Sequence, residues 1–85
     1  MDVARKGATL SRRLAWLPSV VEVRGAGLML GVELDRVARD VIADCLARGV
    51  VVGSAGERVL RLTPPLTIAD DELDRALTVL EEVLQ

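Results

Sequence analysis

Histidine, phenylalanine and tyrosine are absent from this 85-residue sequence, and cysteine, lysine and tryptophan each occur once. Without histidine, and with Cys45 as its single thiol, the chain lacks the ligand set of a zinc or haem site and cannot form an internal disulfide. The scarcity of aromatic rings removes the stacking platforms that single-stranded nucleic-acid binding uses. The sequence therefore predicts a protein of a reducing compartment with no metal site and no nucleic-acid partner.

The sequence also lacks a large excess of either positive or negative charge. The formal net charge is −2, so there is no excess of basic residues for nucleic acid or an anionic membrane. No apolar run reaches the ~18 residues of a membrane span, and the N-terminus lacks the pattern of a secretory signal. We expect a soluble, cytoplasmic protein with no membrane contact.

What the chain does have is aliphatic residues, which raise its hydrophobic content to 51%. A chain of this length fits one domain, residues 1–85, with a core built mainly from leucine, valine and alanine. Such a small domain buries only about 60–65% of the surface of its unfolded chain, so its stability alone is marginal.

Hydrophobic periodicity and the Gly and Pro residues divide the chain into helices with a 3.6-residue repeat and short β-type runs. The predicted elements are a helix over 2–17, strands over 20–24 and 28–34, a helix over 36–48, a strand over 50–52 followed by a turn over 53–56, a strand over 58–62, and a helix from about 70. This order, α-β-β-α-β-β-α, with short links within the strand pairs, predicts an α+β two-layer sandwich. It has a mainly antiparallel sheet of about four strands with helices packed on one face.

The same patterns predict which side chains are buried. In the second strand the alternate residues Leu28, Leu30, Val32 and Leu34 share one face. Gly31, on the other face, indicates close approach by another backbone or side chain. The helices contribute three apolar stripes: Val3, Leu10, Leu14 and Leu17; Val37, Val41, Ile42, Cys45 and Leu46; and Leu73, Leu77, Leu80 and Leu84. Gly49 is placed to cap the middle helix.

A search for catalytic groups finds none in the chain, because no nucleophile has a base beside it. The segment 25–27 lacks the third glycine of a dinucleotide fingerprint and is best explained as a turn between strands. Lys6 stands among arginines on a helix face that we expect to meet solvent, so it is a poor candidate for a Schiff base. Cys45 is expected to be a buried, inert thiol, and Trp16 to pack under the sheet or at an interface.

Arg61 is the exception among the charged residues. It lies in a strand that runs into Pro64 and Pro65, with Leu60 and Leu62 on the opposite face. The prolines fix the direction of the chain, and a planar guanidinium grips a carboxylate well only when its orientation is fixed. Periodicity alone leaves two interpretations open: a carboxylate ligand, or the more common surface ion pair.

Two motifs resemble those of a known family. Residues 24–34, RGAGLMLGVEL, are similar to the arginine-glycine-x-glycine-leucine segment of class III pyridoxal-phosphate aminotransferases, and residues 59–68, VLRLTPPLTI, to their next signature. The link over 49–52 and the helix over 70–84 also resemble that family. The resemblance covers nearly the whole chain and is best with the acetylornithine branch. Ornithine, succinylornithine and 4-aminobutyrate aminotransferases stay open.

The resemblance implies a function for the whole enzyme. These aminotransferases transfer an amino group from acetylornithine or a similar ω-amine to 2-oxoglutarate through pyridoxal phosphate, in arginine biosynthesis for the acetylornithine branch. They are homodimers with active sites at the subunit boundary. The position of Arg61 matches the arginine that binds the α-carboxylate of glutamate or 2-oxoglutarate.

The resemblance also implies what this chain lacks. In the family the Schiff-base lysine, the aspartate at the pyridine nitrogen and the phosphate-binding residues belong to the large domain, and no segment here matches them. We therefore expect the chain to be the C-terminal small domain, partner of that large domain, with no cofactor bound and no activity alone. Ala69 stands where members of the family often have a capping Ser or Thr, so we expect Asp70 to cap the last helix.

Two other hypotheses remain. The chain could be a free-standing α+β amino-acid-binding or regulatory module, in which Arg61 grips a carboxylate without catalysis. It could also be a purely structural dimerisation domain in which the motifs serve only as scaffold.

Overall fold

The computed structural model describes residues 3–26, 29–64 and 68–85, so the predictions that concern Leu28 and Pro65, and the side chain of Val3, lie outside it. The predicted order of elements is confirmed. The elements are α1 Val3–Ala15, β1 Val20–Ala26, β2 Met29–Leu34, α2 Ala38–Ala47, β3 Gly53–Gly56, β4 Val59–Leu62 and α3 Asp70–Val83.

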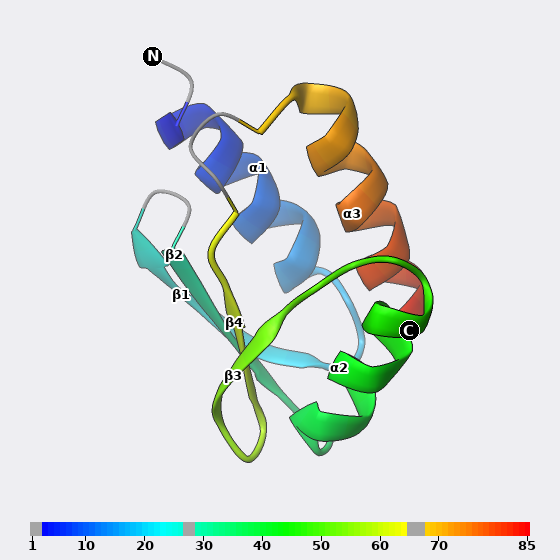
Figure 1. Cartoon of the computed structure of the whole chain (residues 1–85). Coiled ribbons are helices and arrows are strands. Elements are labelled where there is room, and N and C mark those ends of the chain that lie inside the picture. The colour runs from blue at the N-terminus through cyan, green and yellow to red at the C-terminus, as the bar shows by residue number, and fades with distance from the viewer. Residues whose placement is uncertain (1–2, 27–28, 65–67) are drawn as a thin grey trace.

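The molecule has two layers, a four-stranded sheet and a layer of three helices (Figure 1). The strand order is β1-β2-β4-β3, and every neighbouring pair is antiparallel. In Figure 1, α1 and α3 run side by side behind the sheet, and α2 lies below them next to β3. The predicted α+β two-layer sandwich is therefore confirmed.

The core lies between the layers and is almost wholly aliphatic. Alternation places Leu30, Val32 and Leu34 of β2 on the side of the sheet that faces the helices. The helices pack leucines at three- and four-residue spacing against them. All of them belong to one buried cluster: Leu10, Leu14, Leu30, Val32, Leu34, Ala38, Val41, Cys45, Leu60, Leu62, Leu73, Leu77, Leu80 and Leu84. One face of the sheet, formed by β2 and β4, and three helix stripes thus close a single core.

A second contact between α1 and α3 is electrostatic. Arg13 of α1 donates to Glu81 at 2.7 Å and to Asp74 at 2.8 Å, so its guanidinium bridges two turns of α3. The two carboxylates raise the pKa of Arg13. Both oxygens of Glu81 accept from the same guanidinium fork, so this bridge is bidentate and adds to the stability of the α1–α3 contact.

The third strand is displaced from its predicted place. Residues 50–52 form no strand, and the segment predicted as a turn, 53–56, pairs with β4 through Gly53 opposite Arg61 and Ser54 opposite Leu60. Val50 instead donates its backbone N–H to the Cys45 carbonyl at 2.8 Å, as part of the helix end. The valines resemble a strand because two of them, Val50 and Val52, pack on the core.

The middle helix follows its prediction except at one residue. Gly49, just beyond its end, has φ +85°, the left-handed conformation of a helix-terminating glycine. Val41 and Cys45 are buried, but Leu46 is 61% exposed. The prediction for Leu46 was wrong because the buried face of α2 is centred on Ala38, Val41 and Cys45, and Leu46 lies outside it.

The N-cap of the last helix is Ala69, one residue before the predicted cap, Asp70. Ala69 holds the N-cap position and its backbone N–H donates to the Glu72 carboxylate at 3.2 Å. Asp70 lies within the first turn, where it accepts from Arg5 at 3.2 Å. The expected Asp70 cap was wrong because this carboxylate is held by α1. Across the three ranges of the chain that are described, no helix is both long and apolar enough to cross a membrane.

Candidate carboxylate-binding site

Arg61 occupies the third position of β4 and points away from the core. Its neighbours Leu60 and Leu62 are buried, so the alternation predicted from sequence is confirmed. Across the ladders, Arg61 lies opposite Gly31 of β2 on one side and Gly53 of β3 on the other. Two residues without side chains therefore flank the guanidinium, and this leaves open space around it on the outer face of the sheet.

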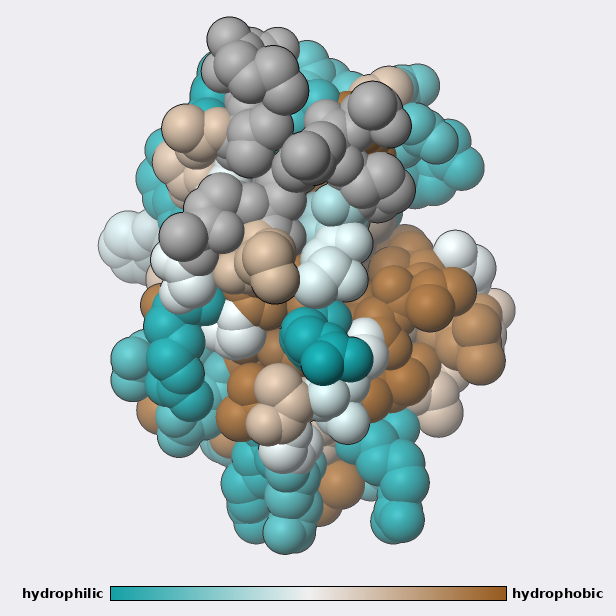
Figure 2. Space-filling model, turned by 60° about the vertical axis from the view of Figure 1, so that its left-hand side comes forward, coloured by the Kyte–Doolittle hydropathy of each residue, from teal (hydrophilic) through white to brown (hydrophobic). Residues whose placement is uncertain are grey.

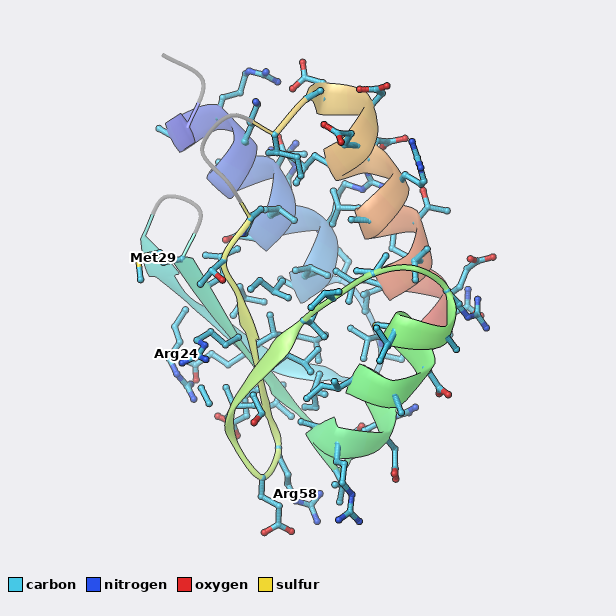
Figure 3. The ribbon with its side chains drawn as sticks, in the orientation of Figure 1. Arg24, Met29 and Arg58 are labelled. Atoms are coloured by element: carbon cyan, nitrogen blue, oxygen red, sulfur yellow. The ribbon has the colours of Figure 1, made fainter. Side chains whose placement is uncertain are left out.

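The guanidinium of Arg61 has no charged partner in the part of the chain that the structure describes. No ion pair or hydrogen bond joins its guanidinium to any other residue within 3–26, 29–64 or 68–85. Arg24, in the same cross-strand row, differs: it pairs with Glu22 at 3.3 Å and Glu33 at 3.2 Å. These acids, Glu33 foremost, raise the pKa of Arg24. In Figure 3 Arg24 and Met29 extend away from the helix layer, on this outer face.

A hollow of about 320 Å³ opens beside Arg61. Its walls are the segment 50–53, the end of β4 with Thr63 and Pro64, and the side of α3 near Ile68 and Leu73. Arg61 is the one charged residue in this wall as far as the structure describes it. Figure 2 shows a brown, hydrophobic area beside teal side chains on the side of the molecule that carries the sheet.

This arrangement suits one chemistry. An apolar wall lowers the local dielectric and strengthens an ion pair, and the guanidinium fork can donate two parallel N–H groups to a carboxylate. A larger hollow of about 560 Å³ lies between α2 and β3, but it has both Arg39 and Glu57 at its rim. Opposite charges there cancel, so the smaller hollow is the better anion site.

Lys6 lies elsewhere than predicted. Its side chain is only 11% exposed, and its Nζ donates to the Ile68 carbonyl and lies 4.0 Å from Asp70 Oδ1. The expectation of a solvent-facing lysine was wrong because Lys6 precedes Leu10 and Leu14 at four-residue spacing and so belongs to the buried stripe of α1. That spacing is the signal in the sequence that could have revealed it.

Gly31 does not meet the close approach that its place in a strand predicted. A Cβ added there would lie 3.7 Å from Val59 Cγ1 and 3.9 Å from the Arg24 carbonyl oxygen, which are ordinary contacts. The prediction was wrong within this chain because the outer face of the sheet is open.

The predictions for Cys45 and Trp16 concern whether each side chain is buried. Cys45 is fully buried, so its expected burial is confirmed, and burial raises the pKa of its thiol. That the thiol is inert stays a prediction. Trp16 is 83% exposed, which excludes packing under the sheet. A role for Trp16 at an interface stays a prediction.

The fold and the site together define a small two-layer α+β domain in which Arg61, without a partner among the described residues, lies beside an apolar wall. Comparison with known families identifies the wider group. The family model "Aminotransferase class-III" matches residues 1–84. The chain belongs to the class-III aminotransferase family.

Its relatives are considerably longer than the chain. It is 43% identical over 84 residues to the acetylornithine aminotransferase of Corynebacterium efficiens, a match that covers 98% of this chain and 21% of that protein. The acetylornithine aminotransferase of Bacillus subtilis is 43% identical over 86 residues, with 98% and 22% covered. The chain thus spans about one fifth of the length of the curated relatives it matches.

Solved structures of aminotransferases also resemble this chain over nearly its whole length. N-acetylornithine aminotransferase from Stenotrophomonas maltophilia superposes with a TM-score of 0.85 at 31% identity, covering 96% of this chain and 25% of the other. An ornithine aminotransferase from Toxoplasma gondii, described with partial occupancy of PLP at its active site, gives 0.84 at 31% identity, covering 98% and 22%.

Proposed function

We propose that this chain is the small domain of an acetylornithine/ornithine-type aminotransferase that transfers an amino group to 2-oxoglutarate. In this proposal Arg61 binds the α-carboxylate of 2-oxoglutarate or glutamate. The observation that carries the proposal is that Arg61 lines an apolar hollow, lies opposite Gly31 and Gly53, and has no partner for its guanidinium among the described residues. The names of the relatives support the reaction class.

Arg61 contributes binding and orientation rather than a chemical step. Strand β4 is hydrogen-bonded on both sides, so the backbone of Arg61 is fixed before the substrate arrives. A carboxylate held by both arms of the fork presents the rest of the substrate in one direction. The apolar wall keeps water away from the ion pair, which strengthens it.

Pyridoxal phosphate supplies the electron sink of transamination when it is bound to an enzyme. The residues described here do not fit its attachment, because the chain's single lysine, Lys6, directs its amine to the Ile68 carbonyl. We therefore assign the cofactor, the Schiff-base lysine and the choice of amino donor to the part of the enzyme outside this chain.

The placement of the chain is part of the proposal. We place it at the C-terminal end of the enzyme, after the large domain, in a homodimer whose active sites lie at the subunit boundary. The reading frame around residue 1 tests this: a large domain with the cofactor lysine encoded upstream fits the proposal, and one encoded downstream contradicts it.

Steady-state kinetics of the full-length enzyme test the role of Arg61. For Arg61→Gln we expect kcat/KM for 2-oxoglutarate to fall about 10–100-fold, the value of a hydrogen-bonded charge pair of 1.5–3 kcal/mol. Arg39→Gln, an exposed arginine on α2 remote from the hollow, is the control and should leave the constant unchanged. An unchanged constant for Arg61→Gln would favour the purely structural domain.

A further inference from the structure

The first turns of α1 hold the start of α3 through a buried charge. The Lys6 side chain passes between the two helices, and its Nζ donates to the Ile68 carbonyl, two residues before α3 begins. Asp70, in the first turn of α3, lies 4.0 Å from the same ammonium and 3.2 Å from Arg5 Nη2. Arg5 and Lys6, near the start of the chain, thus contact Ile68 and Asp70, near its end.

The contact of the Lys6 ammonium with the start of α3 stabilises the fold only in one geometry. Burying an ammonium is costly unless hydrogen bonds and an opposite charge compensate, so Lys6 stabilises the fold only while the Ile68 carbonyl and Asp70 keep their places. Displacement of Ile68 would leave a buried donor without its acceptor. The position of this segment is therefore coupled to Lys6 more tightly than an apolar contact would couple it.

The segment held by Lys6 is also a wall of the Arg61 hollow. Ile68 and Leu73 both line that hollow. The Leu73 N–H donates to the Ala69 carbonyl at 3.0 Å, in the turn that opens α3 directly after Ile68. On the opposite side, Leu73 lines the small depression where Lys6 and Asp70 meet.

We propose that Lys6 is a positioning residue for the carboxylate site: its buried ammonium fixes Ile68 and the start of α3, and so fixes the apolar wall that faces Arg61. Lys6 contacts no substrate in this account. It acts through the distance between the wall and the guanidinium, which decides how well water is excluded from the bound carboxylate. The inference rests on the proposed function of Arg61.

The test is made on the full-length enzyme with Lys6→Met, which keeps the unbranched shape of the side chain, shorter by one atom, and removes its charge and its hydrogen-bond donor. We expect kcat/KM for 2-oxoglutarate to fall about tenfold, while kcat/KM for the amino donor changes less than about twofold. Lys6→Arg should restore most of the loss, because the depression beside Lys6 gives a longer cation room.

Arg13→Met is the matched structural control. It removes the other charged bridge between α1 and α3, so we expect a lower Tm but unchanged kinetics for 2-oxoglutarate. If Lys6→Met prevents folding, Lys6→Gln, a shorter side chain that keeps a donor, replaces it with the same expected selectivity. Equal losses for both substrates, or the same kinetic loss in Arg13→Met, would reduce Lys6 to a general stabiliser and overturn the inference.

Arg61→Gln separates this inference from the proposed function. A loss with Arg61→Gln and none with the Lys6 variants overturns the positioning role alone. No loss with either residue overturns both.

Discussion

Gly53 of β3 lies directly opposite Arg61 of β4, and the guanidinium extends over it: a Cβ added to Gly53 would be 3.6 Å from both Nε and Nη2 of Arg61. That distance is an ordinary van der Waals contact, so a single Cβ fits beside the guanidinium but leaves little room for a larger side chain. The arginine side chain therefore lies over the position that Gly53 leaves open.

The contact predicts a graded effect of substitutions at Gly53. Gly53→Ala should be tolerated, whereas the branched side chain of Gly53→Val would collide with Arg61 and turn its fork. We expect kcat/KM of the full-length enzyme for 2-oxoglutarate to fall about tenfold for Val and less than about twofold for Ala. Equal kinetics for the two variants would show that Arg61 does not need this orientation.

Gly25 should be harder to replace than Gly49 without loss of stability. Its φ is +134°, and a Cβ there would lie 2.1 Å from the backbone oxygen of Met29, so the hairpin between β1 and β2 must shift. We expect Gly25→Ala to lower the free energy of unfolding by about 2–3 kcal/mol. Gly49→Ala, with φ +85° and nothing within 4 Å of the new Cβ, should cost about 1 kcal/mol. Urea unfolding of the chain measures both, and a smaller loss at Gly25 than at Gly49 would contradict the hairpin geometry.

The buried thiol predicts a pH dependence of stability. Burial, and next the charge of Asp44, raise the pKa of Cys45 in the folded chain. The unfolded chain loses this proton at a lower pH than the folded one, so stability declines once the pH rises above the ordinary thiol pKa of about 8.5. Between pH 8 and 9.5 we therefore expect the free energy of unfolding to decrease as the pH rises. The loss should disappear in Cys45→Ala, and a slope that persists in this variant would assign the dependence to another group.

The chain alone should not act as an enzyme. Because Lys6 is committed to the Ile68 carbonyl, addition of pyridoxal phosphate should give neither lysine-linked absorbance nor transamination. Calorimetry with 2-oxoglutarate, glutamate and arginine should show weak binding or none. Micromolar binding of one of them would favour the free-standing amino-acid-binding module.

The parts of the fold fixed by local pattern were predictable from the sequence. Alternation in β2 and the three- and four-residue spacing of leucines in α3 identified their buried faces, because each pattern has one side that must meet a core. The outward direction of Arg61 followed from Leu60 and Leu62 on either side of it.

What could not be predicted depends on pairings between distant residues. The true third strand starts at Gly53, because pairing with Arg61 and Leu60 supplies its hydrogen bonds, and the preceding valines gave no sign of this. The two glycines beside Arg61 come from strands before and after α2, so only the register of the sheet brings them together. Burial of Lys6 could have been inferred from its spacing to Leu10, but its acceptor on Ile68 could not.

The most direct test of the account pairs Arg61 with the substrate group that it is proposed to bind. The full-length enzyme and its Arg61→Gln variant are assayed with 2-oxoglutarate and with the analogue whose α-carboxylate is replaced by a neutral amide. In the unmodified enzyme we expect the amide to lower kcat/KM about 10–100-fold, whereas in Arg61→Gln the two substrates should differ by less than about threefold. If the amide costs as much in the variant as in the unmodified enzyme, Arg61 does not bind that carboxylate.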